Sequence, residues 1–490
     1  MKTFLFLGVA LYPWGIATAQ TAPLPTPAQA PVPSNLPPVD YAGAMWTPAA
    51  EGNFNPQNRP QSQPIDRVVI HDIEGPAAAG IAIFQKTDAS VSAHYIVSGD
   101  GRVWQMVREH NVAWHAGNRD INHRSVGIEI EGYAYRPGWY GATTYETAAK
   151  LVRDITTRRG ISRDRTHIIG HAEVPNPRDP TRFGGVSGHT DPGPFWNWAA
   201  FMTLVRNDAR LVETRVPATV RPGETLPVSV TLTNTGDDPW PVNTAPNPKI
   251  ALQASGTLVV LGTENGRASQ LFNRQGWISP MVAAAATVTG APADTLPGTS
   301  GRFEFMLRGP RELGTWSEQL RLTTMPTASQ GGSPVSFGDK VMVATRVVPW
   351  VIDASSADAQ KKSSTMGAPM ARWSVALPLG GIYAVYAAPP KPAQTPRQKH
   401  FRYQFNTLDG AKTVLARPQD GGKGWLLAGY FRFAGPLKNG PITAVELHSA
   451  PAGVDAKNAG AIRFIGPFPA ATTGPSQTLG RTDEPFEKEF

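Results

Sequence analysis

The chain has 490 residues, more than a single hydrophobic core usually organises, so about two to four domains are expected. Its 47 prolines and 48 glycines favour β-rich modules joined by turns. The net charge of +8 favours anionic partners, although it fits equally well a basic surface without a particular partner. No Lys/Arg cluster is interleaved with aromatic residues, so a nucleic acid partner is not expected. The absence of cysteine excludes cysteine zinc ligands and a cysteine nucleophile.

Residues 1–19 have the pattern of a secretory signal peptide. Lys2 supplies the positive region, residues 4–16 form the apolar region, and Ala-Thr-Ala at 17–19 is a cleavage signal. A retained membrane anchor is the weaker alternative, because the apolar run is short and contains Pro13. We therefore expect a mature protein that is secreted or resides in the cell envelope, without a membrane span.

The next segments differ sharply in composition. Residues 20–64 are rich in Pro, Ala, Gln and Asn, and their low apolar content predicts a linker. Residues 65–206 contain apolar runs with strand character, which favour an α/β or α+β sheet domain, at 68–70, 94–97, 103–106, 126–130 and 167–169. This unit also contains eight of the ten histidines, which points to metal or acid–base chemistry here: His71, His94, His110, His115, His123, His167, His171 and His189.

One helix of the first unit is well marked. Thr143 and Glu146 are spaced as a capping box, in which each side chain would satisfy a free amide of the first turn. Gly160 is suited to end the helix, because glycine readily adopts the left-handed conformation of that position. Apolar residues follow the cap at helical spacing: Ala148, Leu151, Val152 and Ile155.

The chain after residue 210 reads as β structure. In residues 211–348, apolar and polar residues alternate around Val228 and again around Phe305, which predicts a β-sandwich. Residues 349–467 are a third, also β-rich unit, and residues 468–490 are expected to be a loose tail. Most downstream tryptophans are expected to be core residues, with sugar platforms as the alternative: Trp240, Trp277, Trp316, Trp350, Trp373 and Trp425.

The chemistry of the first unit centres on His71, His171 and Asp191. Two histidines and one carboxylate that leave a fourth position free for water are typical of a catalytic zinc site. His71 ends a strand pattern and His171 follows another, so both would come from rigid elements. A base is needed near the water, and Glu129 or Glu131 could supply it, because strand alternation puts both on one face.

Several short motifs of residues 67–206 resemble those of the zinc-dependent N-acetylmuramoyl-L-alanine amidases, in the same order and spacing: VVIH, VSAHY, AWHAG, NHRSVGIEIEG, IIGHAEV and HTDPGP. This family includes phage T7-type lysozyme-amidases and the peptidoglycan recognition proteins. The resemblance implies an α/β domain with a mixed central sheet flanked by helices. It also implies Zn²⁺ as cofactor and peptidoglycan as substrate.

The resemblance assigns roles residue by residue. His71, His171 and Asp191 would bind zinc, and Glu129, the first acid of GIEIEG, would activate water. His189 lies where many relatives carry lysine, and we expect it to donate to the oxyanion, with orientation of Asp191 as the alternative. Three residues would line the substrate groove: Trp114, His115 and Asn122.

Two features depart from the family pattern. Ala93 stands where some phage relatives have a catalytic tyrosine, so that role is absent or filled elsewhere. The segment between His171 and Asp191 is longer than in compact members, and the insertion, residues 176–187, would shape the groove or act as a lid. Asp179 inside it is a weaker alternative to Asp191 as metal ligand.

The C-terminal units resemble known β modules more weakly. Residues 211–348 resemble Ig-like domains through RPGET, VTLTNTG and GRFEFMLRGP. Residues 349–467 resemble golvesin C-terminal-like or carbohydrate-binding-like β-sandwiches through WVIDA and GWLLAGYFRF. They would contact wall polysaccharide or serve as spacers.

The function expected from the sequence is a secreted peptidoglycan hydrolase. Zinc-activated water would cleave the amide between N-acetylmuramic acid and L-alanine. The alternative is a non-catalytic recognition protein that binds peptidoglycan in the same groove. Non-catalytic relatives typically lack a zinc ligand, whereas this chain retains His71, His171 and Asp191, which favours the enzyme.

Overall fold

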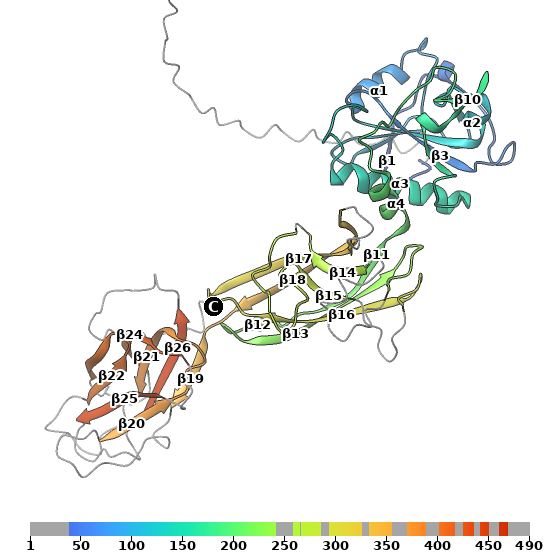
Figure 1. The fold of residues 1–490 in the computed structure, drawn as a ribbon. Helices are drawn as coiled ribbons and strands as arrows, with labels where there is room; N and C mark the ends of the chain where they lie inside the picture. Colours follow the sequence, from blue (N-terminus) through green and yellow to red (C-terminus); the bar gives the residue numbers. More distant parts are fainter. Residues whose placement is uncertain are drawn as a thin grey trace, which may run out of the picture.

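A helix-flanked sheet domain is followed by two β units along the chain (Figure 1). The computed structural model describes residues 39–241, 258–264, 266–285, 294–325, 333–354, 370–388, 401–416, 425–435, 442–449 and 460–468. The predicted signal peptide, the first part of the predicted linker and the predicted tail after residue 468 lie outside these residues. Within them, no helix is both long and apolar enough to span a bilayer.

The first unit is built on one mixed six-stranded sheet, which confirms the expected fold class. Its strand order is β1 (Ala44–Trp46), β5 (Val103–Gln105), β4 (Tyr95–Val97), β7 (Ser125–Ile130), β3 (Arg67–Asp72) and β8 (Ile168–Gly170). Strands β4, β7, β3 and β8 are mutually parallel, whereas β5 runs antiparallel to β4. The central strands are almost continuously buried, as expected for parallel strands covered on both faces.

Short elements and helices surround this sheet: η1 (Glu51–Asn53), α1 (Ala77–Phe84), α2 (Arg119–Arg124), α3 (Ala142–Arg159), η2 (His171–Glu173), α4 (Trp198–Arg206), and the strand pairs β2 (Phe54–Asn55) with β6 (Val112–Ala113) and β9 (Pro175–Asn176) with β10 (Asp179–Phe183). Helix α3 buries the predicted apolar face and ends at Gly160 with φ 67°, as expected. The predicted capping box is wrong. The helix begins after Gly141 without a side-chain cap, and Glu146 instead binds Arg321 of the second unit.

The folded unit begins well before the expected boundary at residue 65. Strand β1 pairs with β5 at the edge of the sheet. Arg59 is only 2% exposed, and its guanidinium donates to backbone carbonyls at Asn122, His123 and Ser125. This part of the predicted linker is therefore held by hydrogen bonds, which its composition does not indicate.

The second unit contains two sheets with a common apolar core. One has the order β11 (Ala209–Arg215), β13 (Thr225–Asn234), β16 (Ser300–Arg308), and the other β12 (Thr219–Val220), β18 (Val335–Val347), β17 (Gly314–Met325), β14 (Leu258–Thr263), β15 (Val282–Ala285). The indole of Trp240 is buried between Phe303 and Phe337, one from each sheet. The alternation predicted around Val228 and Phe305 is confirmed, since both side chains are buried.

The third unit also has two four-stranded sheets. Their orders are β19 (Trp350–Ala354), β26 (Ala461–Phe468), β21 (Gly381–Ala388), β24 (Leu426–Phe433), and β20 (Ala371–Val375), β25 (Ile442–Ser449), β22 (Phe401–Thr407), β23 (Gly410–Ala416). Trp373 and Tyr403 are buried in its core. The core role expected for tryptophans holds for Trp240, Trp277 and Trp373, whereas Trp316, Trp350 and Trp425 are only half-buried.

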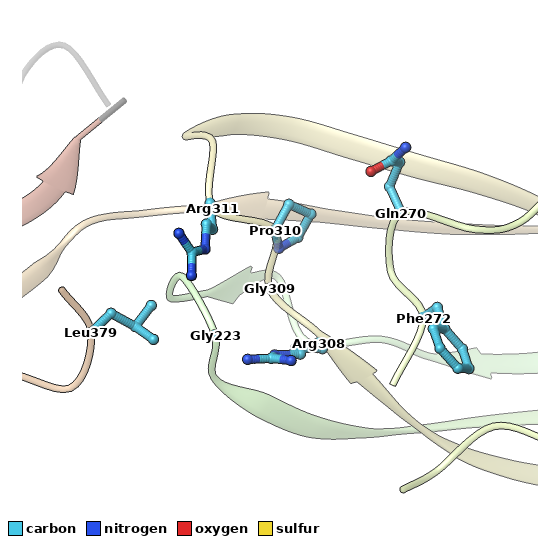
Figure 2. Close-up of a pocket in the computed structure, with 8 residues that line it drawn as sticks. All are labelled: Gly223, Gln270, Phe272, Arg308, Gly309, Pro310, Arg311 and Leu379. Atoms are coloured by element: carbon cyan, nitrogen blue, oxygen red, sulfur yellow. The ribbon is translucent and has the colours of Figure 1, made fainter. Parts of the chain in front are cut away.

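The first two units share one continuous apolar cluster, which runs from the sheet core through Trp196 and Phe201 to Trp240. Helix α4 contacts β18, and the ion pair between Arg321 and Glu146 crosses the junction at 2.6 Å. The core of the third unit forms a separate cluster. The second and third units meet at a cavity of about 280 Å³, where Leu379 faces Gly223, Arg308 and Arg311 (Figure 2).

Candidate active site

Three side chains that are distant in sequence converge at the carboxyl edge of the sheet. His71 lies near the end of β3, His171 directly follows β8, and Asp191 is held by a hydrogen bond from the Ala172 amide to its carbonyl oxygen, 2.9 Å. The carboxyl ends of parallel strands lie at one edge, which brings the two histidines together. The two Nδ1 atoms are 3.1 Å apart, and the Asp191 carboxylate lies 3.3 Å from His71 Nδ1 and 3.2 Å from His171 Nδ1.

These three groups fit a divalent cation. Zinc–ligand bonds of about 2.0–2.1 Å in a tetrahedron place neighbouring ligand atoms about 3.3–3.4 Å apart, close to the spacings of His71, His171 and Asp191. Burial and the neighbouring His171 lower the pKa of His71 to about 4, so its ring is neutral and can offer a lone pair. Among the described residues, His71, His171 and Asp191 are the group of side chains arranged to bind a metal ion.

Glu129 lies beside the three ligands. It pairs in register with His71 on the adjacent parallel strand, so the two side chains point to the same face. Burial, together with the charges of Asp191 and Asp72, raises the pKa of Glu129 well above its ordinary value. In the part of the chain that the structure describes, no hydrogen bond is made by its carboxylate. Such a group is suited to accept a proton.

The structure distinguishes Glu129 from Glu131. Strand β7 ends at Ile130, and the Glu131 carboxylate accepts a hydrogen bond from the Gly99 amide at 2.9 Å. Glu131 is therefore engaged by a loop at the sheet edge, whereas Glu129 stays beside the ligands. Strand alternation could not make this distinction, because the sequence pattern continues the strand to Glu131, whereas β7 ends at Ile130.

His189 covers the open side of the site. Its ring stacks on that of His171 with centroids 4.3 Å apart, and its side chain is 52% exposed. A hydrogen bond to Asp191 raises the pKa of His189. The GGVSG loop holds it in place, since the His189 amide donates to the Gly184 carbonyl at 2.8 Å. Gly184 has φ +82°, and a Cβ there would lie 2.2 Å from the His189 carbonyl oxygen, so glycine is required.

Two of the three residues expected in the substrate groove, His115 and Asn122, form hydrogen bonds within the domain. The His115 ring is 8% exposed, and its Nδ1 is 2.9 Å from His71 Nε2. The Asn122 side-chain oxygen accepts hydrogen bonds from the His115 and Ala116 amides, at 3.2 and 2.8 Å. Trp114 is half-buried, and its amide donates to Ser92. Sequence reasoning also missed Ser125, whose hydroxyl contacts His115.

The insertion expected at 176–187 borders the site. Strand β10 folds back on β9, and the Val186 amide donates to the Gly117 carbonyl at 2.9 Å, beside the loop that holds His115. Phe183 and Val186 are exposed, as are apolar side chains of neighbouring loops: Tyr135, Trp139 and Phe195. Asp179 binds Thr181 and is not part of the metal-binding group, which removes it as an alternative ligand.

The sheet and the His-His-Asp group define a class of hydrolase with a site for one divalent cation. Comparison with known proteins then names the family. The model of the N-acetylmuramoyl-L-alanine amidase family matches residues 61–194. N-acetylmuramoyl-L-alanine amidase A of Achromobacter lyticus is 33% identical over 180 residues, which covers 34% of this chain and 96% of that protein. The chain belongs to this family, and its activity is that of an N-acetylmuramoyl-L-alanine amidase.

Other relatives match the same region. The 1,6-anhydro-N-acetylmuramyl-L-alanine amidase AmpD of Escherichia coli (strain K12) is 28% identical over 181 residues, which covers 36% of this chain and 79% of that protein. A crystal structure of a selenomethionine AmpD derivative is 27% identical, with a TM-score of 0.28, and covers 34% of this chain and 96% of that one. The family implies a peptidoglycan substrate.

Proposed function

We propose that this protein is a secreted, zinc-dependent amidase that cleaves the bond between the lactyl carbonyl of N-acetylmuramic acid and L-alanine. The observation that carries the proposal is the mutual spacing of the ligand atoms of His71, His171 and Asp191, 3.1 to 3.3 Å. Export rests on the signal-peptide pattern of residues 1–19.

Each residue near the ligands has a distinct role in this proposal. Zinc, when bound, would polarise the scissile carbonyl and lower the pKa of a water molecule towards about 7. Glu129 takes the proton of the attacking water and passes it to the leaving amine. Its raised pKa favours this exchange, because a base works best when its pKa is near the working pH.

His189 is proposed to donate a hydrogen bond to the oxyanion. Its ring lies at the open side of the site, stacked on His171, with an exposed edge available to the substrate. The hydrogen bond to Asp191 favours the protonated ring, which can donate. Stabilising an oxyanion in this way contributes about 3–4 kcal/mol in other hydrolases.

The proposal is tested by digestion of purified peptidoglycan sacculi with the full-length protein. Mass spectrometry of the soluble products should find free stem peptides that begin with L-alanine. A chelator should abolish their release, and added zinc should restore it. If the protein is retained on sacculi but releases no stem peptide with zinc present, it is the non-catalytic recognition protein instead.

We also propose that the two β units contact acidic groups of the wall at the cavity between them. Arg308 and Arg311 reach into the cavity of about 280 Å³ near Leu379 (Figure 2). Neither guanidinium has an ion-pair partner among the residues that the structure describes. Two arginines without counter-charges favour an anionic ligand, in keeping with the net charge of +8.

Retention on insoluble peptidoglycan tests this second proposal. The full chain would carry Glu129→Gln to prevent digestion, with and without Arg308→Gln and Arg311→Gln. We expect the double substitution to lower the retained fraction several-fold at low salt. Arg302→Gln is the matched control, because Arg302 lies on the same strand but pairs with Glu304 at 2.8 Å. Equal retention of all three proteins would favour a spacer role.

A further inference from the structure

A chain of buried hydrogen bonds leads from helix α2 to the metal-binding group. The Ser125 hydroxyl lies 2.6 Å from the Ile121 carbonyl oxygen and 3.1 Å from His115 Nε2. On the other side of the ring, His115 Nδ1 lies 2.9 Å from His71 Nε2. The remaining nitrogen of His71, Nδ1, faces His171 and Asp191.

The direction of every hydrogen bond in this chain follows from its first member. A carbonyl oxygen can only accept, so the Ser125 hydroxyl donates its single proton to Ile121. Its oxygen must then accept from His115, which places a proton on His115 Nε2. A neutral His115 ring therefore has a lone pair on Nδ1, and His71 Nε2 must donate to it. This leaves His71 Nδ1 without a proton.

The His115 ring is fixed in this place by packing. Gly127 lies under the ring, and a Cβ at that position would be 2.5 Å from His115 Cγ. The Asn122 side-chain oxygen also accepts a hydrogen bond from the His115 amide, at 3.2 Å. Ser125 is fully buried, so water does not compete for its hydroxyl. The His115 ring is 8% exposed and, among the described residues, forms no ion pair with a carboxylate, so a charged ring would be costly at this place.

We propose that Ser125 and His115 are positioning residues that hold His71 in the tautomer whose Nδ1 lone pair points at the metal. The proposal rests on the zinc site proposed above. His171 has no such support from the described residues, because its Nε2 is buried without a hydrogen-bond partner. Of the two histidine ligands, only His71 therefore has its ring orientation and tautomer set by a buried hydrogen bond within the part of the chain that the structure describes.

Zinc affinity of the full-length protein, measured by competition with a chelator of known affinity, tests the proposal. Loss of a group that orients a ligand typically weakens metal binding about 10- to 100-fold. We expect Ser125→Ala to weaken zinc binding about 10-fold and His115→Leu more strongly. Ser98→Ala is the matched control and should stay within about twofold, because Ser98 is a similarly buried serine of the same domain whose hydroxyl donates to Asp100.

A conservative substitution separates orientation from packing. In His115→Gln, the side-chain oxygen can still accept a hydrogen bond from His71 Nε2, so zinc affinity should recover in part relative to His115→Leu. Long-range ¹H–¹⁵N spectra of metal-free protein labelled at histidine would give a direct readout. The His71 ring should carry its proton on Nε2 in the wild type and populate both tautomers in Ser125→Ala.

The outcomes separate this inference from the proposed function. If the wild type neither binds zinc nor cleaves peptidoglycan, the proposed function fails and the inference with it. If the wild type does both, but folded Ser125→Ala and His115→Leu bind zinc as tightly as the wild type and Ser125→Ala keeps the same His71 tautomer, the inference alone is overturned. Thermal unfolding and circular dichroism would establish that each variant is folded.

Discussion

The first unit contains two buried groups of ionisable side chains that differ in how their charges are compensated. Around Glu109, which is fully buried, Arg158 and Arg159 each donate to the carboxylate and Tyr95 donates at 2.7 Å. Around Glu129, no donor is present among the described residues, and the nearest charges are the carboxylates of Asp191 and Asp72.

The pKa of each glutamate reflects this difference. Burial raises the pKa of Glu109, but hydrogen bonds and charge from Arg158 and the charge of Arg159 outweigh it and bring the pKa to about 2. For Glu129, burial and neighbouring carboxylates act in the same direction, and the pKa is raised. A buried carboxylate that is fully paired, such as Glu109, stabilises the fold. An unpaired carboxylate beside a metal-binding group, such as Glu129, can instead accept a proton from a substrate or water.

The largest effect is expected for Glu129→Gln. Loss of a general base typically lowers turnover about 10²- to 10⁴-fold, and zinc content should not change. The metal-free variant should be no less stable than the wild type, because the substitution removes a charge that burial disfavours. Stem-peptide release, zinc content and thermal unfolding measure the three quantities. Unchanged turnover would exclude Glu129 as the base.

Glu109→Gln should show the opposite pattern. It leaves Arg158 and Arg159 without their buried partner, and breaking such a pair typically costs about 3–5 kcal/mol of unfolding free energy. Denaturant unfolding of the full chain measures this loss. Asp154→Asn is the control, since Asp154 pairs with Arg158 near the surface, where a pair contributes about 0–1 kcal/mol. Comparable losses in both variants would contradict the contrast between the two groups.

His189→Ala should lower turnover about 10²- to 10³-fold, as for loss of one oxyanion donor. His189→Lys should restore much of the activity, because an ammonium can donate to the same oxyanion. Steady-state rates on soluble muramyl peptides would report both. If alanine and lysine give equal rates, His189 acts only by orienting Asp191.

The smallest effect is a pH dependence of stability. The pKa of Glu109 is lowered from 4.5 to about 2 in the folded protein, so its stabilising contribution is complete above pH 4.5 and is lost as the pH falls towards 2. Glu109→Gln should therefore flatten the dependence of unfolding free energy on pH across this window. A profile identical to that of the wild type would show that other groups dominate acid unfolding.

The sequence anticipated the parts of the site that depend on strands. His71 and His171 were expected together as zinc ligands, from rigid elements that each follow an apolar run. The structure adds that the two runs are parallel strands whose ends meet at one edge. Alternation left the choice between Glu129 and Glu131 open, because it does not reveal where β7 ends, and only the resemblance favoured Glu129. The positions of His115 and Asn122 depended on tertiary contacts with His71 and with the backbone, for which no local pattern exists.

Two misjudged features have the same physical origin. Thr143 and Glu146 have the spacing of a cap, but Glu146 is attracted to Arg321, 175 residues away in the chain. Residues 39–64 have the composition of a linker, but Arg59 finds carbonyl partners at the surface of the sheet domain and becomes buried there. In both places a partner distant in sequence overrides the local preference, and a single sequence does not display that partner.

The continuous apolar cluster between the first two units has a consequence for truncation. A chain cut at residue 210 would leave the outer side of α4 facing water and would remove Arg321 from Glu146. Such a fragment would be prone to aggregate even though its catalytic groups are all retained. The smallest well-behaved enzyme should therefore extend through β18, and these two units should melt in one cooperative transition while the third melts independently.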